Sequence, residues 1–246
     1  YAGVDFNEIH TLAEARAIAK EKGVEFECCL GVSAGACHAC SFLSKQYGRA
    51  YAVCVNYLGD KRYCSIYSLV KTGDLFGAEM LYDIIPNELN HYDYQTFNAR
   101  ETKFYAVVTN CNTGRAEYLP VEDMKRDIIA VRASSSLPLL ARMVEIGGEK
   151  YLDGGISDPI PVKQSMKMGN RKNVVVLTRP EGYRKKPSHN LPVLRAKYWD
   201  YPRLVSRMGV RDLQYNETLD LIKEQEESGN LFVIRPQSSL LIGRVE

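Results

Sequence analysis

Hydrophobic and polar positions along the chain follow two patterns, short continuous apolar runs and helical repeats. Continuous apolar runs are typical of strands covered on both faces, and apolar positions at i, i+3, i+4 and i+7 are typical of amphipathic helices. Because the two patterns alternate, we expect an α/β sheet with helices on both faces. Strands are predicted at residues 24–30, 104–109, 116–119, 143–146, 150–152, 174–178 and 231–234, and helices at 36–48, 122–133, 159–168 and 215–228.

Two further segments are predicted to be helical. Thr11 and Glu14 form a capping box, in which both side chains can bond free amides at the start of a helix, and Gly23 is suited to end that helix. Residues 63–98 are rich in tyrosine and poor in strand signals. They could form a helical cap over a site, or their aromatic side chains could simply pack a helical layer.

Length and composition indicate one globular unit. The 246 residues are 45% hydrophobic and 25% charged, which is enough apolar material for a sizeable core. No shift in composition divides the chain, so we expect a single domain over residues 1–246. A formal net charge of +2, without a Lys/Arg-rich arm, argues against a nucleic-acid partner.

The seven cysteines are odd in number and lack the spacing of a disulfide framework. In a chain of this length, that favours reduced thiols and a cytoplasmic protein. Cys37 and Cys40 form a C-x-x-C pair, which could bind a metal or act in redox chemistry, or could be two small apolar residues that pack a helix. Because no second such pair completes a zinc site, packing is favoured, and no cofactor is expected.

The strongest chemical signal is Gly31-Val32-Ser33-Ala34-Gly35, which matches the nucleophile elbow G-x-S-x-G. A strand is predicted before it and a helix after it, as this motif requires. A sharp turn brings backbone segments close together, so a Cβ at Gly31 or Gly35 is expected to clash. The turn would expose the Ser33 hydroxyl, and the N–H of Ala34 at the helix start would stabilise an oxyanion. An ordinary Gly/Ser turn is the alternative.

A serine nucleophile needs a base, and histidine is the usual one. His10 precedes the serine, His38 should point away from it on the following helix, and His91 lies in the tyrosine-rich region. Only His189 follows a possible acid in the chain order of α/β-hydrolases, although its basic surroundings are typical of a solvated loop. A Ser-His-Asp esterase that uses His189 is therefore one hypothesis.

Asp153 is the stronger candidate for the base. It ends a short predicted strand and is followed by Gly154 and Gly155, which let the backbone turn and let another segment approach closely. Burial in such a corner would make the carboxylate a more effective base. Asp158 competes for this role, but it precedes Pro159 and is typical of a turn or a helix N-cap.

Together, G-V-S-A-G and the later D-G-G-I resemble the patatin-like phospholipase family, in its small bacterial branch. The resemblance covers most of residues 24–235 and extends to the segments 134–140, 153–162 and 174–187. It implies a three-layer α/β/α sandwich with a mainly parallel central sheet and a helical, aromatic-rich cap region.

The resemblance also implies an activity and a pair of catalytic residues. Ser33 would be the nucleophile and Asp153 the base of a Ser-Asp dyad that works without histidine. The dyad would cleave fatty-acyl esters of phospholipids or lysophospholipids through an acyl-serine intermediate. No metal or organic cofactor is implied.

One part of the family pattern is missing from residues 1–30. The family carries a Gly-rich loop, roughly G-G-G-x-R-G, some tens of residues before the serine, and its backbone N–H groups form much of the oxyanion hole. Loss of one oxyanion donor costs on the order of 10²–10³ in rate. We therefore expect the native Gly-rich segment to lie upstream or to be absent, and a non-catalytic protein of the same fold is an alternative.

The expected partners are an acyl-lipid substrate and, transiently, an anionic membrane surface. Arg179, Arg184, Lys185 and Lys186 form a basic loop that could contact anionic headgroups. Four charges are a modest patch, so a solvated loop is the alternative.

Overall fold

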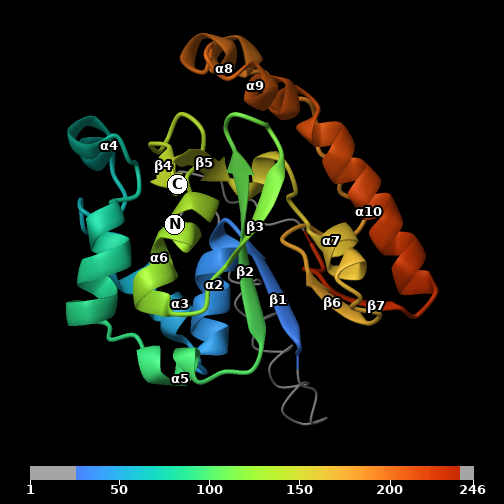
Figure 1. Cartoon of the computed structure of the whole chain (residues 1–246), viewed down its shortest axis with the longest axis horizontal. Helices are drawn as coiled ribbons and strands as arrows, with labels where there is room; N and C mark the ends of the chain where they lie inside the picture. The colour runs from blue at the N-terminus through green and yellow to red at the C-terminus, as the bar shows by residue number, and fades with distance from the viewer. Residues whose placement is uncertain (1–25, 239–246) are drawn as a thin grey trace.

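A mixed β-sheet lies at the centre of the computed structural model, which describes residues 26–238 (Figure 1). β2 pairs with β1 and then β5 along one edge and with β3 along the other, and β4 pairs with the far edge of β5. β1 and β2 are parallel, whereas the β2–β3, β2–β5 and β4–β5 pairs are antiparallel. The five strands are β1 (Cys28–Val32), β2 (Lys103–Asn110), β3 (Ala116–Pro120), β4 (Val144–Ile146) and β5 (Glu149–Asp153).

The α/β architecture predicted from the sequence is confirmed, but the expectation that the central sheet is mainly parallel was wrong. Two of its connections are tight turns, one that contains Gly114 (φ 65°) and one at Gly147 and Gly148 (φ 61° and 83°). Connections this short can join only antiparallel neighbours, because a parallel pair needs a crossover of a dozen or more residues.

A second, two-stranded sheet joins residues that lie far apart in the sequence. β6 (Asn173–Val176) and β7 (Leu231–Ile234) are parallel, in a register that pairs Asn173 with Leu231 and Val176 with Ile234. Ile222 of α10 (Arg211–Glu227) and Val162 of α7 (Val162–Lys167) are buried against this small sheet together with Val175 and Leu231. β7, the last strand among the described residues, is thereby packed against two helices.

Helices cover the central sheet on both sides, which gives the three layers (Figure 1). One layer contains α2 (Ala34–Leu43), α3 (Arg49–Asn56), α4 (Ile66–Thr72), η1 (Met80–Leu89), α5 (Tyr94–Asn98) and α6 (Met124–Ser134). On the other side, η2 (Gly154–Ile156), α8 (Leu191–Lys197) and α9 (Pro202–Gly209) pack with Leu152 of β5, whereas α7 and α10 pack against the small β6–β7 sheet. None of the helices formed by residues 26–238 has the length and apolar character needed to cross a bilayer.

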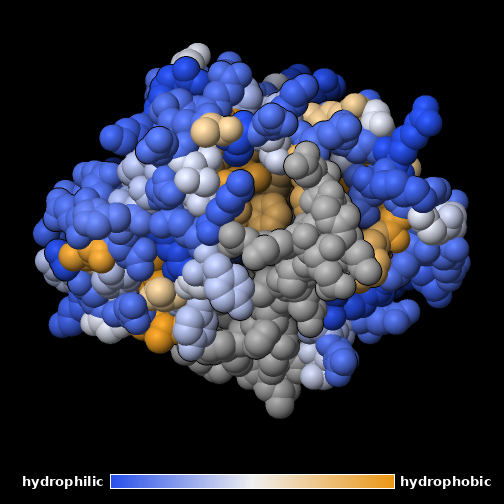
Figure 2. Space-filling model, turned by 90° about the horizontal axis from the view of Figure 1, so that it is seen from below, coloured by the Kyte–Doolittle hydropathy of each residue, from blue (hydrophilic) through white to orange (hydrophobic). Residues whose placement is uncertain are grey.

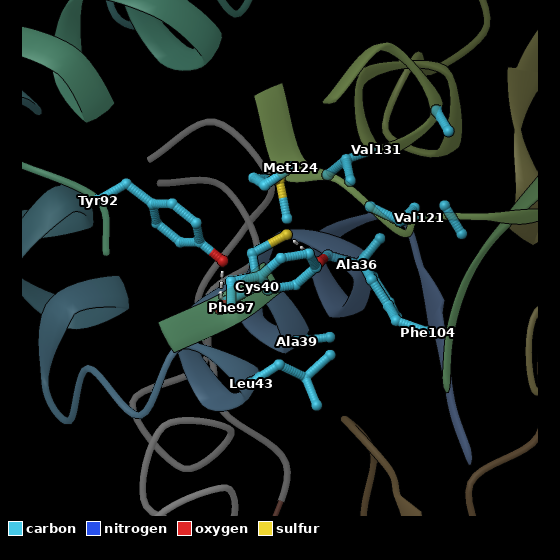
Figure 3. Packing of buried hydrophobic residues seen from close by; sticks show 12 residues of the cluster. Ala36, Ala39, Cys40, Leu43, Tyr92, Phe97, Phe104, Val121, Met124 and Val131 are labelled. Carbon is cyan, nitrogen blue, oxygen red and sulfur yellow. Dashed lines mark hydrogen bonds between the residues drawn. The ribbon is translucent and has the colours of Figure 1, made fainter. Parts of the chain in front are cut away.

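The main core lies between α2, α5, α6 and β2 (Figure 3). Ala36, Ala39, Cys40 and Leu43 are buried on one side of α2, at the helical spacing predicted from the sequence. The hydroxyl of Tyr92 donates a 2.8 Å hydrogen bond to the Cys40 carbonyl, so a polar group at the edge of this core is satisfied.

The helix predicted at residues 36–48 is shorter than expected. α2 ends at Leu43, and Lys45 adopts a left-handed conformation (φ 57°) that closes the helix, with the N–H of Gln46 bonded to the carbonyl of Ser41 (3.0 Å). Gly48 (φ 76°) then starts α3 instead of ending α2. The spacing of apolar residues carries no information about this backbone reversal, so the sequence prediction placed the end of the helix too late.

The tyrosine-rich segment is helical, as predicted. η1 is a π-type helix, in which the N–H of Asn90 bonds the carbonyl of Ile85 (2.8 Å), and this wider winding contains Pro86. Tyr63, Tyr92 and Phe97 are buried, so several of these aromatic side chains pack the helical layer. The capping box and the helix expected to end at Gly23 lie outside the described residues.

The surface seen from below is dominated by hydrophilic residues, and the hydrophobic residues visible there form small, separate groups (Figure 2). None of the seven cysteines, all of which lie among the described residues, is part of a disulfide. The cytoplasmic location stays a prediction.

Candidate active site

The register of β2 brings together two residues that are distant in sequence. β1 and β5 occupy the same edge of β2, one after the other, because β3 takes the opposite edge. β1 ends with Val32 paired to Val107, and β5 ends with Asp153 paired to Val108. Ser33, the residue after Val32, therefore lies beside Asp153.

Ser33 occupies the strained corner that the elbow motif predicts. Its backbone has φ 54° and ψ −125°, a conformation that non-glycine residues rarely adopt. Its Oγ donates a hydrogen bond to Asp153 Oδ2 at 2.5 Å, and its N–H donates to Ser134 Oγ at 3.0 Å. Hydrogen bonds from both the backbone and the side chain of Ser33 therefore stabilise the strained turn.

A run of three serines at the C-terminal end of α6, Ser134 to Ser136, fixes the elbow to the rest of the site. Ser134 Oγ accepts from the Ser33 N–H and donates to the Val107 carbonyl (2.6 Å). Ser135 Oγ donates to the Ser33 carbonyl (3.0 Å), and the carbonyl of Ser136 accepts from the Asp153 N–H (2.9 Å). The three serines thus hold the two candidate residues in one frame.

Asp153 is buried, with 2% of its surface exposed, and it is anchored on several atoms. Its Oδ1 accepts from the Gly155 N–H at 2.7 Å, and its carbonyl accepts from Thr109 Oγ1 at 2.8 Å. With Oδ1 occupied in this way, Oδ2 is aimed at Ser33 Oγ.

The glycines of the two motifs leave little room for a Cβ at three of four positions. An added Cβ would lie 2.6 Å from Ala36 Cα at Gly31, 2.1 Å from the Val107 carbonyl at Gly154, and 3.0 Å from Asp153 Oδ1 at Gly155. At Gly35, which is exposed, no described atom lies within 4 Å of such a Cβ. The clash expected at Gly35 was wrong, because this residue lies on the outer side of the first turn of α2.

The start of α2 supplies hydrogen-bond donors beside the serine. The N–H groups of Ala36 and Cys37 bond to the Ser33 carbonyl (2.9 and 3.3 Å). The first N–H groups of a helix have no partner within it, so those of Ala34 and Gly35 project from the positive end of α2 next to Ser33. This is where an oxyanion formed at the serine would be stabilised.

The structure does not bring a histidine to the serine among the described residues. His189 and His91 are exposed on loops, and His10 lies outside the described part of the chain. His38 is buried on α2, its Nδ1 bonds no described residue, and burial lowers its pKa to about 4. The hydrogen bonds of Ser33 to described side chains go to Asp153, Ser134 and Ser135 instead.

Asp158 is occupied elsewhere. Its Oδ2 accepts from the Tyr118 hydroxyl at 2.6 Å, and burial raises the pKa of its carboxyl. The helix that follows begins after Pro161, so Asp158 is not its N-cap. The N–H of Asp158 instead closes a turn on the Gly154 carbonyl (2.9 Å), which agrees with the other alternative, a turn.

The thiols of Cys37 and Cys40 lie in different environments. The Cys40 thiol lies in the main core and donates to the Ala36 carbonyl (3.2 Å), whereas Cys37 Sγ lies 3.3 Å from Ser135 Oγ. Burial raises the pKa of the Cys37 thiol, which keeps it protonated beside the elbow. Both residues act as packing residues around α2.

Sequence reasoning did not assign a role to several residues around the site. Tyr82 of η1 and Arg132 of α6 line a small pocket together with Ser135, and burial raises the pKa of the Tyr82 hydroxyl. The run S-S-S before Leu137 was a visible signal for the serine frame, since three adjacent hydroxyls can bond backbone groups. No local pattern pointed to Tyr82 or Arg132.

The basic loop around residue 184 is partly neutralised. Arg184 forms an ion pair with Asp220 of α10 and also donates to the Asn216 carbonyl (3.0 Å). The N–H of Lys185 donates to the Asn216 side chain (2.8 Å). These contacts attach the loop to α10.

Comparisons with known proteins agree with this geometry. A family model described as patatin-like phospholipase matches residues 8–166, and a model described as a domain of unknown function, DUF6363, matches residues 201–246. The uncharacterized protein YjjU of Escherichia coli (strain K12) is 30% identical over 159 residues, which are 63% of this chain and 44% of that protein. The chain thus spans less than half the length of this relative. Because the first match covers more than half of the chain and includes both Ser33 and Asp153, the chain belongs to the patatin-like phospholipase family.

Proposed function

We propose that the chain is a serine acyl hydrolase that cleaves fatty-acyl esters of phospholipids or lysophospholipids. The 2.5 Å hydrogen bond from Ser33 Oγ to Asp153 Oδ2, at a strained strand–turn–helix corner, carries the proposal. Membership of a phospholipase family supports a lipid ester as the substrate.

The first half-reaction forms an acyl-enzyme. Ser33 Oγ attacks the ester carbonyl carbon while its proton passes to Asp153 Oδ2. The tetrahedral oxyanion develops beside the N–H of Ala34 and is stabilised by the positive end of α2. The C–O bond then breaks, the alcohol leaves with the proton held by Asp153, and the acyl group stays on Ser33.

The second half-reaction releases the fatty acid. Asp153 takes a proton from water, the water oxygen attacks the acyl carbon, and Ser33 leaves with that proton restored to its Oγ. The Gly155 N–H bond to Oδ1 keeps the same carboxylate oxygen directed at the reacting atoms in both halves. One carboxylate therefore serves as base and acid in turn.

The test is a fluorophosphonate probe with the adduct mapped by mass spectrometry, followed by hydrolysis assays on variants. We expect an adduct on Ser33 that is lost in Ser33→Ala. Asp153→Asn should lower kcat by about 10²–10⁴, because general-base catalysis contributes that much. His189→Ala and Asp158→Asn are matched controls, and both should keep their activity.

Each alternative has its own outcome in this experiment. Inactivity of a folded His189→Ala would replace the dyad by a Ser-His-Asp triad, whether or not Asp153→Asn keeps its activity. An unlabelled Ser33 in a folded protein that hydrolyses no ester would favour a binding role for the fold.

A further inference from the structure

The helical hairpin formed by α8 and α9 has two different sides. On its inner side, Leu194, Tyr198 and Leu204 are buried. They pack against Leu152 of β5 and Ile156 of η2. Its outer side exposes two large apolar side chains, at 74% for Trp199 and 57% for Val193. The inner side accounts for the stability of the hairpin, but not for the apolar residues on the outer side.

The outer side is also strongly basic. Residues 191–203 contain three basic residues and one acidic residue, Asp200. Arg195, Lys197 and Arg203 are all exposed, and the ion pairs found among residues 26–238 involve none of them. This distinguishes the outer side from the preceding loop, where Arg184 is paired with Asp220.

The hairpin is attached to the segment that holds the candidate active site. The Tyr198 hydroxyl accepts from the Leu139 N–H at 3.0 Å, and Leu139 follows Ser136 by three residues. Leu139 itself packs against the inner side of the hairpin. The hairpin is therefore attached directly to the segment that continues from the serine frame.

A second exposed apolar helix flanks the same segment. α4 exposes Ile66 at 74% and Val70 at 83%, and the residues after it are fixed by the Leu75 N–H bond to the Leu140 carbonyl (2.7 Å). α4 and α8 both lie at the top of the molecule in Figure 1, on either side of the β4–β5 region. The exposed apolar residues on these two helices thus border the same end of the molecule.

We propose that the outer side of the α8–α9 hairpin docks the protein onto an anionic lipid bilayer, with Trp199 in the interface and α4 as a second contact. Tryptophan is enriched at membrane interfaces because its ring is apolar and its N–H is polar. Basic residues beside it are attracted to anionic headgroups. The inference rests on the proposed function, since docking would bring acyl lipids to Ser33.

The basic charge of the hairpin favours a lipid surface, rather than a groove on another protein, as its binding partner. On the hairpin, the exposed apolar side chains are interspersed with basic ones, whereas a stable protein interface has an apolar centre depleted of charge. An anionic bilayer matches the excess of basic over acidic residues along the hairpin.

The chain supplies its own probe, because Trp199 is its single tryptophan. We would add vesicles of phosphatidylcholine, with and without phosphatidylglycerol, to the Ser33→Ala protein and record intrinsic fluorescence. A blue shift, quenching by brominated lipid and reversal by salt are expected with the anionic vesicles. An unchanged spectrum with both vesicles would overturn the proposal, as would a shift that depends on protein concentration without lipid, which indicates self-association.

Matched variants separate docking from folding and from catalysis. Arg195→Gln/Lys197→Gln should weaken vesicle sedimentation by about tenfold or more, and Arg171→Gln/Lys223→Gln, which neutralises two exposed basic residues elsewhere, should bind as the unmodified chain does. Trp199→Ser should likewise bind more weakly than Tyr47→Ser, whose side chain is 76% exposed before α3. Equal binding by the paired variants would contradict the proposal.

A soluble substrate distinguishes failure of docking from failure of the proposed function. Hydrolysis of p-nitrophenyl butyrate should be the same in the docking variants and the unmodified chain, while hydrolysis of vesicle lipid falls. Loss of both activities in a folded variant would mean that the hairpin acts on the active site rather than on the membrane. Absence of both activities in the unmodified chain would sink the proposed function and leave the fluorescence result to decide on docking.

Discussion

Ser33 and Asp153 lie 120 residues apart, and backbone interactions determine that they meet. Val32, the residue before Ser33, pairs with Val107 of β2, and Asp153 pairs with the next residue, Val108. Ser134 links β2 to the elbow, because its hydroxyl bonds both the Val107 carbonyl and the Ser33 N–H. A change that shifts this register would separate the pair without touching either side chain. At this scale, the site is a property of strand pairing as much as of its two reactive groups.

Burial of His38 predicts that the stability of the protein depends on pH. Its pKa is about 4 in the folded chain because burial disfavours the charged ring, compared with about 6.5 when unfolded. The unfolded state therefore binds more protons between these values, so the free energy of unfolding falls as pH drops from about 6.5 toward 4. The expected loss from this group is roughly 2–3 kcal/mol at pH 4.5.

The measurement compares urea unfolding at pH 7 and pH 4.5 in the unmodified chain, in His38→Leu and in the exposed-site control His91→Leu. We expect His38→Leu to lose less stability on acidification than the other two proteins. The same loss in all three would show that His38 is not protonated on unfolding.

Helix α4 is joined to the rest of the molecule by a buried carboxylate. The Asp74 side chain, 5% exposed, accepts from the Arg142 N–H (2.8 Å) and from its guanidinium (2.9 Å), and Arg132 lies 3.5 Å away. Because Arg142 ends the segment that begins with the serine frame, this carboxylate connects α4 to the surroundings of the site.

Asp74→Ala should lower the free energy of unfolding by about 2–3 kcal/mol, since it removes charge-assisted bonds and leaves the N–H of Arg142 without that acceptor. Chemical denaturation measures the change. Asp60→Ala is the control, because it removes a pair with the exposed Arg62 and should change stability little. Equal effects in the two variants would mean that the Asp74 cluster adds no more than a surface pair.

At the scale of the whole molecule, the β6–β7 sheet and the buried face of α10 attach the C-terminal residues to the rest of the protein. β7 pairs with β6, and Ile222 of α10, 2% exposed, packs with Val175 and Leu231. Two family models match the chain on either side of residues 167–200, yet Ile222 and Leu231 also share a core cluster with Val162, which belongs to the first match. The single-domain prediction therefore has a direct test.

Ile222→Ala should lower the free energy of unfolding by about 2–5 kcal/mol, through lost burial and a cavity. The loss should appear in one transition that Trp199 fluorescence and far-UV circular dichroism report at the same urea concentration. Leu213→Ala, in the same helix but at a 59% exposed position, should have a small effect. Two separate transitions would divide the chain into two domains.

Much of the fold could be predicted from sequence, because strands and helices have local signatures. Apolar runs located β2, β3, β5 and β7 within a few residues, and turn residues located the reversal at Asn112–Gly114. The helices α8 and α9 were not predicted, since their apolar positions are few and lie between prolines and charges. Their burial depends on Leu152 and Ile156, which lie about 40 residues or more away in the chain.

The sequence by itself determined the elbow around Ser33, the candidate Asp153 and the alternation of strands and helices, because glycine sterics and side-chain periodicity act over a few residues. Only the tertiary structure decided that β5 runs antiparallel on the same edge of β2 as β1, that the Cβ clash falls at Gly31 and not at Gly35, and that a basic hairpin flanks the site. These features depend on which distant segments pair and pack, and no local pattern contains that information.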